Sequence, residues 1–575
     1  PESGDLFSLT CYDNMGRVSK ATNPFRGYTT QDCTTTSGLE WTTNTYDAAG
    51  RPWKVTTPDG AFVETLYSLS TSGEIGTVVT VKDQALKERR SITNAIGQLK
   101  RVDEPSGTLG LGAITAPYQP TSYAYDLLNN LTTVTQIGDT TAECGGASSC
   151  TQSRTFTYDA LSRLKSAVNP ESGTINYTYD ANNNLATKTD ARGITTNYTY
   201  DRLNRVTERS YAMPSPTPSP SQYQNSPTVN YYYDNITNGK GKLKKVTSSV
   251  STTEYTSFDI LGRVTASKQT TDGVEYGGSG SPAAMTYTYN LGGAMIEQQY
   301  PSGRVVKNTL DATGDLSMVT SKESSSAIYK TYVNDFTYNA AGAVTSLKLG
   351  NGKFESTQFN SRLQPIQIGL GASVGDTNSL KLDYSYGDWN GSSIDATKNN
   401  GNIVQQVITT PTVGSSSGFT ATQKYYYDSL NRIDDSTETI SSTQTWRQDF
   451  TFDRYGNRRF NETNTSMPAS FSNQALTNPT ISTSNNRLTS TGWTYDASGN
   501  TTGDPQSRTF IYDGENKQVE VKNSSSVTIG QYSYDGDGRR VKKYVPSTGE
   551  TTIFVYDAAG KQIAEYSTIV ADAST

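Results

Sequence analysis

The side chains that most often perform catalysis are scarce in this 575-residue chain, which contains no histidine. Its absence removes the commonest general base, the histidine of nucleophilic triads and a common metal ligand. Neither a phosphate-binding glycine loop nor a dinucleotide fingerprint occurs. Two carboxylates could still hydrolyse a glycosidic bond, but most aspartates recur at one position of a repeated motif. We therefore predict no enzyme activity, no catalytic residue and no cofactor.

Two aspartate-rich segments resemble the start of a calcium-binding loop, because oxygen-bearing side chains alternate along them. The segment 180–184 (Asp-Ala-Asn-Asn-Asn) lacks the later glycine and the closing glutamate of an EF-hand. In the segment 535–539 (Asp-Gly-Asp-Gly-Arg), an arginine stands where a third ligand is needed. We interpret both segments as ordinary turns and predict no metal site.

The four cysteines, Cys11, Cys33, Cys144 and Cys150, permit two disulfides. Pairing between neighbours would join Cys11 to Cys33 and Cys144 to Cys150, closing two local loops. The alternative is four unpaired thiols. We favour disulfides, which would place the protein in an oxidising compartment. A zinc site is not expected, because no pair has CxxC spacing and the chain has no histidine.

One motif recurs along nearly the whole chain. It consists of an aromatic residue, Asp or Asn, two variable residues, Gly or Asn, often Arg, and then an aliphatic residue. Recurrence at a fixed offset marks a scaffold, since a catalytic residue is needed only once. The residues that carry the motif, and that we predict to be structural, are Tyr12, Asp13, Gly16, Arg17, Tyr46, Asp47, Gly50, Arg51, Tyr158, Asp159, Arg163, Tyr179, Asp180, Tyr200, Asp201, Arg205, Phe258, Asp259, Gly262, Arg263, Tyr427, Asp428, Arg432, Tyr495, Asp496, Gly499, Tyr534, Asp535, Gly538, Arg539, Tyr556, Asp557 and Gly560.

Each copy of the motif is predicted to form one β-hairpin. The residues before the aromatic alternate between aromatic and threonine, as in 154–158 (Arg-Thr-Phe-Thr-Tyr), which indicates a half-buried strand. The Asp carboxylate can accept the backbone N–H two residues on. The following Gly or Asn tolerates the positive φ of a tight turn. Because a lone hairpin is marginal in water, we expect the hairpins to join in one sheet, with their tyrosines stacked in a ladder.

This pattern resembles the YD-repeat, or Rhs-repeat, family, over roughly residues 5–566. The resemblance implies an all-β chain of about twenty tandem hairpins, wound as a continuous spiralling sheet into a hollow, barrel-like shell. In bacterial toxin members such a shell encloses a variable C-terminal toxin, and in the animal teneurins a related shell takes part in cell adhesion. The segment from Tyr534 to Tyr566 is similar to the stretch just before the family's core region.

One departure from the family pattern limits what the resemblance implies. Toxin-bearing members end in a core with an Asp-Pro-x-Gly-Leu-type self-cleavage motif. Here the only Asp-Pro, at residues 504–505, is followed by Gln-Ser and lies among the repeats. We expect neither protease nor toxin activity in this chain, and we interpret its end as lying before an absent core region.

We expect a single repeat array over residues 1–575, with some interruptions. Stretches rich in Pro, Ser, Thr, Asn and Gly indicate insertions, and the segment 213–220 should be an extended proline-rich loop. The predicted parts are divergent repeats at 1–120, main repeats at 121–566 with insertions near 211–230, 370–421 and 461–485, and a tail at 567–575.

Composition excludes two classes of partner. The net charge is −6, and no long basic run indicates a nucleic-acid groove. No apolar run approaches the ~18 residues of a transmembrane helix. The 38 tyrosines argue against disorder, because disordered chains are poor in aromatics.

The leading hypothesis is a non-enzymatic shell of a secreted or surface-exposed bacterial protein. It would enclose or scaffold a polypeptide, either its own C-terminal toxin or effector region or another chain as cargo. The alternative is an extracellular structural or adhesive protein. Such a protein would assemble with itself into filaments, or bind a cell-surface glycan or protein through exposed tyrosines.

Overall fold

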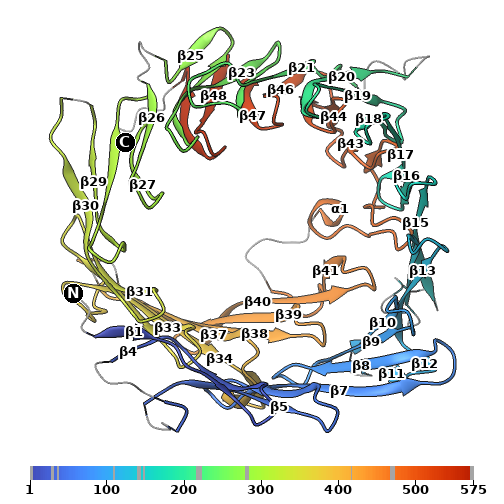
Figure 1. Ribbon diagram of the computed structural model, residues 1–575, viewed down its shortest axis with the longest axis vertical. Helices are drawn as coiled ribbons and strands as arrows, with labels where there is room; N and C mark the ends of the chain where they lie inside the picture. Colours follow the sequence, from blue (N-terminus) through green and yellow to red (C-terminus); the bar gives the residue numbers. More distant parts are fainter. Residues whose placement is uncertain are drawn as a thin grey trace. The chain divides into compact units, whose positions relative to one another are not determined.

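The protein is built almost entirely of antiparallel β-strands (Figure 1). Within the described residues, 35 strands belong to one sheet and eight, β42–β49, to another. The only α-helix in this part of the chain is α1 (Gln474–Thr477). The all-β prediction is therefore confirmed. The computed structural model describes residues 4–27, 32–34, 38–107, 110–138, 144, 146, 149–214, 223–278, 284–324, 326–412, 414–415, 417–466 and 473–569.

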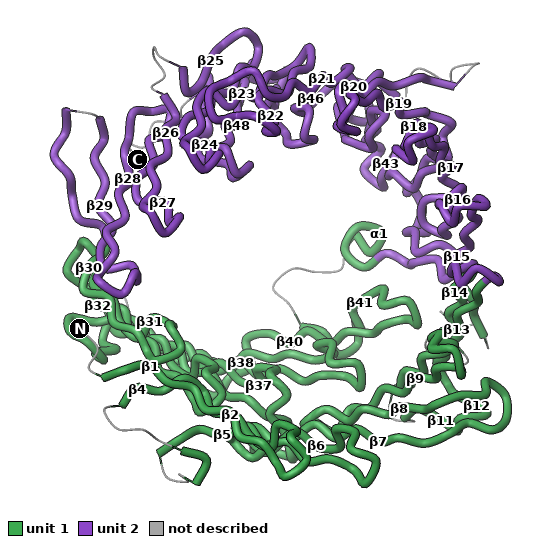
Figure 2. The backbone as a smooth tube through the Cα atoms, viewed as in Figure 1, with its two compact units in different colours: residues 1–125, 133–153, 333–478 green, residues 126–132, 154–332, 479–575 purple. Residues whose placement is uncertain are grey.

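The chain divides into two compact units, each assembled from distant parts of the sequence (Figure 2). Unit 1 comprises residues 1–125, 133–153 and 333–478, and unit 2 comprises residues 126–132, 154–332 and 479–575. In each unit we call the earlier strands the first tier and the later strands the second tier.

The strands of unit 1 belong to two long segments. Its first tier contains β1 (Asp5–Phe7), β2 (Thr10–Tyr12), β3 (Val18–Thr22), β4 (Phe25–Gly27), β5 (Trp41–Tyr46), β6 (Pro52–Thr56), β7 (Phe62–Ser70), β8 (Gly76–Lys82), β9 (Glu88–Thr93), β10 (Leu99–Glu104), β11 (Gly112–Ala113), β12 (Ala116–Pro117), β13 (Gln119–Tyr125) and most of β14 (Leu131–Gly138). Its second tier contains most of β30 (Lys330–Tyr338), β31 (Val344–Leu349), β32 (Phe354–Phe359), β33 (Pro365–Gly371), β34 (Leu380–Tyr386), β35 (Asp388–Asn390), β36 (Ser393–Asp395), β37 (Ile403–Thr410), β38 (Phe419–Tyr427), β39 (Ile433–Ile440), β40 (Thr443–Phe452) and β41 (Arg458–Phe460).

The strands of unit 2 follow the same plan. Its first tier contains most of β15 (Cys150–Tyr158), β16 (Leu164–Asn169), β17 (Gly173–Tyr179), β18 (Leu185–Thr189), β19 (Thr195–Tyr200), β20 (Val206–Ala212), β21 (Val229–Tyr233), β22 (Leu243–Thr247), β23 (Ser251–Phe258), β24 (Val264–Thr271), β25 (Val274–Tyr276), β26 (Met285–Tyr289), β27 (Met295–Gln299), β28 (Val305–Leu310) and β29 (Leu316–Lys322). Its second tier contains β42 (Thr494–Tyr495), β43 (Thr501–Gly503), β44 (Thr509–Tyr512), β45 (Gln518–Lys522), β46 (Thr528–Tyr534), β47 (Arg540–Val545), β48 (Glu550–Tyr556) and β49 (Gln562–Ser567).

The hairpin β17–β18 shows how one repeat folds. Asp180 N donates to Asn184 O (2.9 Å), and Asn183 N donates to Asp180 O (3.2 Å). Asn183 has a φ of +67°. Opposite the aromatic the register shifts by one residue, because Thr178 pairs with Thr187 whereas Tyr179 pairs with Leu185. This is a three-residue loop with one left-handed residue and a β-bulge, which increases the strand twist.

The strand alternation places two kinds of turn at opposite edges of the sheet. The repeat turns, such as 180–184, follow the aromatic of each motif. The return turns, such as 190–194, join one repeat to the next. Because successive strands are antiparallel neighbours, all repeat turns of a tier lie at one edge and all return turns at the other.

In unit 1 the repeat turns of the second tier contact the return turns of the first. Asn399 Nδ2 donates to Asp59 Oδ2 (2.9 Å), and Asn431 Nδ2 donates to Asp83 Oδ2 (2.9 Å), across 340 and 348 residues of chain. The side chain of Arg454, 1% exposed, lies 3.0 Å from Glu104. We call this line of contacts the seam.

Unit 2 has its own seam, at which second-tier repeat turns again contact first-tier return turns. Arg192 donates to Asp513 O (2.9 Å) across 321 residues. Gln269 Nε2 donates to Phe554 O (2.9 Å), while Gln269 Oε1 accepts from Tyr556 N (3.1 Å). The main buried apolar cluster lies here too and consists of Tyr276, Met285, Tyr287, Ile553 and Val555. The hydrophobic core of unit 2 is therefore located at the seam between its tiers.

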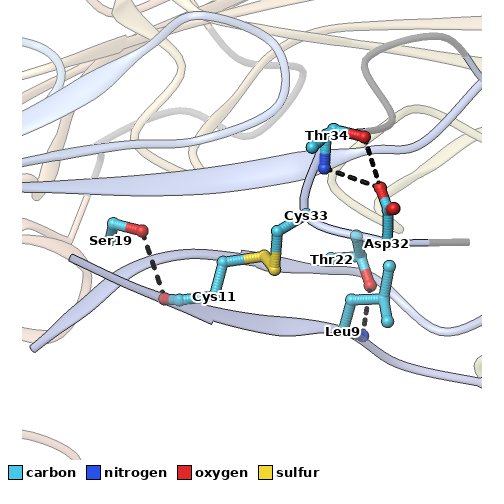
Figure 3. Close-up of a disulfide and its surroundings, with 7 residues drawn as sticks. All are labelled: Leu9, Cys11, Ser19, Thr22, Asp32, Cys33 and Thr34. Carbon is cyan, nitrogen blue, oxygen red and sulfur yellow. Dashed lines mark hydrogen bonds between the residues drawn. A yellow bond between two sulfur atoms is a disulfide. The ribbon is translucent and has the colours of Figure 1, made fainter. Parts of the chain in front are cut away.

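Both pairs of neighbouring cysteines form disulfides, Cys11–Cys33 and Cys144–Cys150. Figure 3 shows the first, in which buried Cys11 of β2 holds the loop that follows β4. In this loop Asp32 Oδ1 accepts from Thr34 N (2.8 Å) and Thr34 Oγ1 (2.6 Å). The disulfide therefore fixes Cys33 to strand β2.

The stretches expected as insertions have different structures. Residues 370–421 include β34 and β37 of the large sheet, so only the connections between these strands depart from the array. One of them contains the separate hairpin β35–β36. Residues 461–485 contain α1 and no strand in their described part. In the stretch 211–230, most of the proline-rich segment 213–220 lies outside the described residues.

Substitution of Gly536 tests how tightly the two tiers of unit 2 pack at the seam. A Cβ atom at Gly536 would lie 2.5 Å from Val246 Cγ1 and 2.6 Å from Val229 Cγ1. We expect Gly536→Ala to destabilise unit 2 by about 1–3 kcal/mol through overpacking, measured by urea denaturation. Gly292→Ala is the matched control, because its Cβ would meet its nearest atom at 3.5 Å. Equal stability of the two variants would contradict a tightly packed seam.

Candidate functional site

In many repeat turns the aspartate uses both carboxylate oxygens. In the first repeat, Asp13 Oδ1 accepts from Met15 N and Arg17 N, both at 2.9 Å. Asp13 Oδ2 accepts from Arg17 Nε at 2.8 Å. The backbone N–H and the guanidinium of Arg17 hold the pKa of Asp13 below its usual range. The carboxylate therefore closes the turn and orients the arginine.

The same geometry recurs in both tiers. Asp159 and Arg163 repeat it with an Oδ2–Nε distance of 2.7 Å, and Asp428 and Arg432 do so at 2.7 Å. Where Asn replaces Arg, as at Asn184, the amide Nδ2 donates to Asp180 Oδ2 (2.9 Å). The left-handed position after these aspartates is filled by Gly, Asn or Ser: Gly16, Gly50, Ser162, Asn183, Asn204, Gly262, Asn431, Gly499, Gly538 and Gly560.

The arginine held in this way lies over the aromatic ring of the next repeat. Arg17 Cζ is 4.3 Å from the ring centroid of Tyr46, and Arg163 Cζ is 4.7 Å from that of Tyr179. At these positions the ring of the expected tyrosine ladder thus contacts a guanidinium of the preceding repeat. Each contact combines a cation with the negative face of a π-system.

The tyrosine hydroxyl reaches back to the preceding repeat. Tyr46 OH donates to Val18 O (2.8 Å), and Tyr200 OH donates to Leu185 O (2.8 Å). The accepting carbonyl belongs to the residue after the arginine position, next to the β-bulge where the strand register shifts. The aromatic residue of one repeat thus bonds a backbone group beside the bulge of its neighbour.

A polar cleft of about 280 Å³ lies at the seam of unit 2. Arg209 Nε donates to Tyr211 OH (2.7 Å), and Tyr211 OH donates to Glu515 Oε1 (2.5 Å). Burial raises the pKa of Tyr211, and it also raises the pKa values of Asp513 and Asp535. Because these groups bond one another or the turn backbone, the cleft joins the two tiers through a buried polar network.

Neither calcium-like segment is arranged as a cation site. Asp180 Oδ1 accepts from two backbone N–H groups, and its Oδ2 accepts from Asn184. Asp535 likewise bonds the turn backbone and Arg539. Across the described ranges, no group of three or more His, Cys, Asp or Glu could hold a metal ion.

Sequence reasoning missed the return turns that form half of the seam. At the seam, Asp190 closes its turn by accepting from Arg192 N (2.9 Å) and Ile194 N (3.1 Å). Asp504, in a return turn of the second tier, accepts from Gln506 N and Arg508 N, both at 3.0 Å. Both follow the spacing of the repeat turns but lack the preceding aromatic residue. A search for the turn spacing alone would have found them.

The comparisons with known proteins agree with this geometry. The RHS repeat family model matches residues 179–212, which run from the last residue of β17 through β18 and β19 to the end of β20. No curated protein sequence matches the chain. The described part contains no helix long and apolar enough to cross a membrane.

Solved structures share the fold over nearly the whole chain. The crystal structure of TcdB2-TccC3 matches with a TM-score of 0.74 and 17% identity, over 96% of this chain and 29% of that chain. The same complex without its hypervariable C-terminal region gives 0.73 and 18%, over 95% and 28%. The Photorhabdus luminescens Tc holotoxin pore gives 0.69 and 16%, over 97% and 30%. The chain thus spans about three-tenths of these solved chains.

The fold and its turns define a tandem β-hairpin repeat protein, in which each repeat is braced by the next. Within that class, the RHS repeat model matches residues 179–212, which confirms the expected resemblance to the RHS, or YD, repeat for that part of the chain.

Removing the Tyr46 hydroxyl tests the bond between neighbouring repeats. Tyr46→Phe keeps the ring beneath Arg17 but loses the bond to Val18 O. We expect a loss of about 1 kcal/mol, seen as faster amide exchange in residues 10–20. Tyr46→Leu, which also removes the π-face, should accelerate exchange further. Equal exchange in wild type and Tyr46→Phe would contradict this role.

The lowered pKa of a turn aspartate predicts a pH-dependent effect of its substitution. The Arg163 backbone N–H, followed by the Arg163 side chain, lowers the pKa of Asp159 from 3.8. Its stabilising contribution should therefore be complete above about pH 4 and lost as the pH falls through the lower folded-state pKa. We expect Asp159→Asn to lower the thermal midpoint by about 1–2 °C at neutral pH. The measurement is thermal unfolding of both proteins at successive pH values. A difference in thermal midpoint that persists in strong acid would contradict a contribution from the ionised Asp159 carboxylate.

Proposed function

We propose that this chain forms part of the wall of a protein shell that encloses a polypeptide. The cargo would be a C-terminal effector region of the same protein or a separate chain, and the wall itself would be non-enzymatic. The observation that carries this proposal is the shared fold with TcdB2-TccC3 over 96% of the chain. One compared structure lacks a hypervariable C-terminal region, which supports a variable cargo beyond a common wall.

The side-chain arrangement favours a wall over an adhesive surface. A glycan-binding aromatic needs a free ring face. Ladder tyrosines such as Tyr46 and Tyr179 instead contact a guanidinium and bond a neighbouring carbonyl. Their hydroxyls and one ring face are already used to join adjacent repeats, so their main contribution is to a continuous wall.

The two disulfides support assembly or function outside the reducing cytosol. All four cysteines of the chain are paired, and disulfides persist in oxidising environments. We propose that the protein is secreted or exposed at the surface of a bacterial cell.

Mass measurement of the full-length protein tests enclosure directly. Native material would be treated with protease, and its mass would then be compared under native and denaturing conditions. We expect a polypeptide that survives the protease and is released only on unfolding, because an intact wall excludes the enzyme. The absence of any retained polypeptide would contradict the proposal.

A seam variant provides the control. Gly536→Val should separate the tiers at Val229 and Val246 and make the retained polypeptide at least several-fold more sensitive to protease, whereas Gly292→Ala should leave it protected. Equal protection in both variants would mean that the wall does not provide the barrier.

A further inference from the structure

One disulfide of unit 1 lies against the residue that anchors its seam. The Cys144–Cys150 bridge lies between the connection that follows β14 and the first residue of β15. A Cβ atom built on Gly138, the last residue of β14, would lie 2.9 Å from Cys150 Sγ, 3.0 Å from Cys144 Sγ and 3.2 Å from Arg454 Cβ. The disulfide and the side chain of Arg454 therefore pack together on the backbone of Gly138.

Arg454 joins the two tiers at this point. It belongs to the second-tier repeat turn 453–457, and its side chain is buried. Its guanidinium donates to Ile137 O (2.9 Å), to Thr121 Oγ1 (2.9 Å) and to Glu104 Oε2 (3.0 Å). These acceptors lie on β14, β13 and β10 of the first tier. A single second-tier arginine thus holds three first-tier strands.

The strength of this anchor depends on the exclusion of water. In a dry site the attraction between Arg454 and Glu104 is strong, and separating the two charges is costly. Water that reached the pair would solvate both charges and weaken their attraction. Cys144 is buried, and the sulfur atoms of both cysteines fill the space beside Arg454 at Gly138. The disulfide therefore helps to keep water from the anchor on that side.

Thiols in solution can cleave this bridge. Cys150 is half-buried, and Ser149 and Thr151 on either side of it are exposed, so a thiolate from solution would attack Cys150 Sγ. The S–S bond then breaks, and Cys144 leaves as a thiolate that takes a proton. A second thiol attacks the mixed disulfide and frees Cys150. Two monothiols are thereby oxidised to one disulfide, and the two cysteines are reduced to thiols.

We propose that the Cys144–Cys150 disulfide is a redox switch for the seam of unit 1. In an oxidising compartment the bridge keeps Arg454 buried and the tiers joined. In a reducing compartment, where thiols such as glutathione keep cysteines reduced, cleavage frees Cys144 from its place beside the anchor. Water then reaches the pair formed by Arg454 and Glu104, and the tiers separate at this point. The response of the seam is independent of any cargo, whereas release of an enclosed polypeptide on reduction rests on the proposed function.

The other disulfide of unit 1 provides a matched comparison. Cys11–Cys33 joins β2 to the loop that follows β4 (Figure 3), and Ser19 Oγ of β3 donates to Cys11 O (3.2 Å). All three residues belong to the first tier, so cleavage of this bridge should loosen the first strands and leave the Arg454 anchor unchanged. Because Cys33 is exposed, the same reductant can cleave both bridges.

Amide exchange of the full-length protein, with and without dithiothreitol, tests the switch. Alkylation of free thiols followed by mass measurement shows which disulfide has been cleaved. We expect exchange in residues 119–123 and 451–457 to become roughly tenfold faster once Cys144–Cys150 is reduced. The double variant Cys144→Ser, Cys150→Ser should exchange fast in these segments without reductant. The control, Cys11→Ser with Cys33→Ser, should exchange slowly there until reductant is added.

Gly138→Ala gives a second test that needs no reductant. The added methyl group would meet both sulfur atoms and Arg454 Cβ, so it should push the disulfide away from the anchor. We expect faster exchange in the same two segments while both disulfides remain intact. Slow exchange in this variant would contradict the close packing of the disulfide and Arg454 on Gly138.

Three outcomes would overturn the proposal. One is complete cleavage of Cys144–Cys150 in the wild-type protein without faster exchange in the two segments, a result that needs no variant to fold. Another is loss of the response in the Cys11→Ser, Cys33→Ser variant, which would assign it to the first disulfide. The third is unfolding of the whole of unit 1 on reduction, which would make the bridge a general stabilising element. A seam that opens on reduction without release of any polypeptide would support the switch and count against the proposed function.

Discussion

The structure depends on the turn carboxylate, which performs two tasks at once. One oxygen accepts backbone N–H groups and closes the turn, while the other orients an arginine. That arginine covers the ring of the next repeat, whose hydroxyl bonds a carbonyl beside the bulge of the first. Each contact is weak, but the cycle repeats along the sheet, so stability accumulates between nearest neighbours. A chain with only 33% hydrophobic residues can therefore form long sheets.

The seams provide the full burial of side chains that a sheet one layer thick cannot provide. Within a tier the rings are only half-buried, as the alternating pattern of β17 shows. Full burial occurs where tiers meet, at Met285 and Val555 in unit 2 and around Arg454 in unit 1. A buried arginine is stable there because it bonds Glu104, Thr121 and backbone carbonyls, which satisfies its charge and donors. Local hairpin formation and contacts across more than 270 residues thus have separate roles.

Much of this architecture can be predicted from the sequence, because the information is local. The alternating strand, the aspartate and the left-handed Gly, Asn or Ser lie close together in the sequence, as in residues 154–162. The seam partners cannot be predicted in this way. Nothing in the sequence around Arg192 indicates its contact with Asp513, which lies 321 residues later. The arginine over the ring of the next repeat was also missed, since the motif shows that Arg recurs but not which side chain it covers. Return turns such as 190–194 were missed because no aromatic residue precedes their aspartate.

The pairing of specific turns across each seam restricts how such a chain can change length. Adding one hairpin to a tier would move every later repeat turn by about 10 Å relative to its partner, so Gly536 would no longer face Val229 and Val246. Lengthening is tolerated where it adds no strand to the ladder, as in the side hairpin β35–β36. Growth and loss of repeats in evolution should therefore occur by sets that restore the alignment, while single insertions collect in the connections.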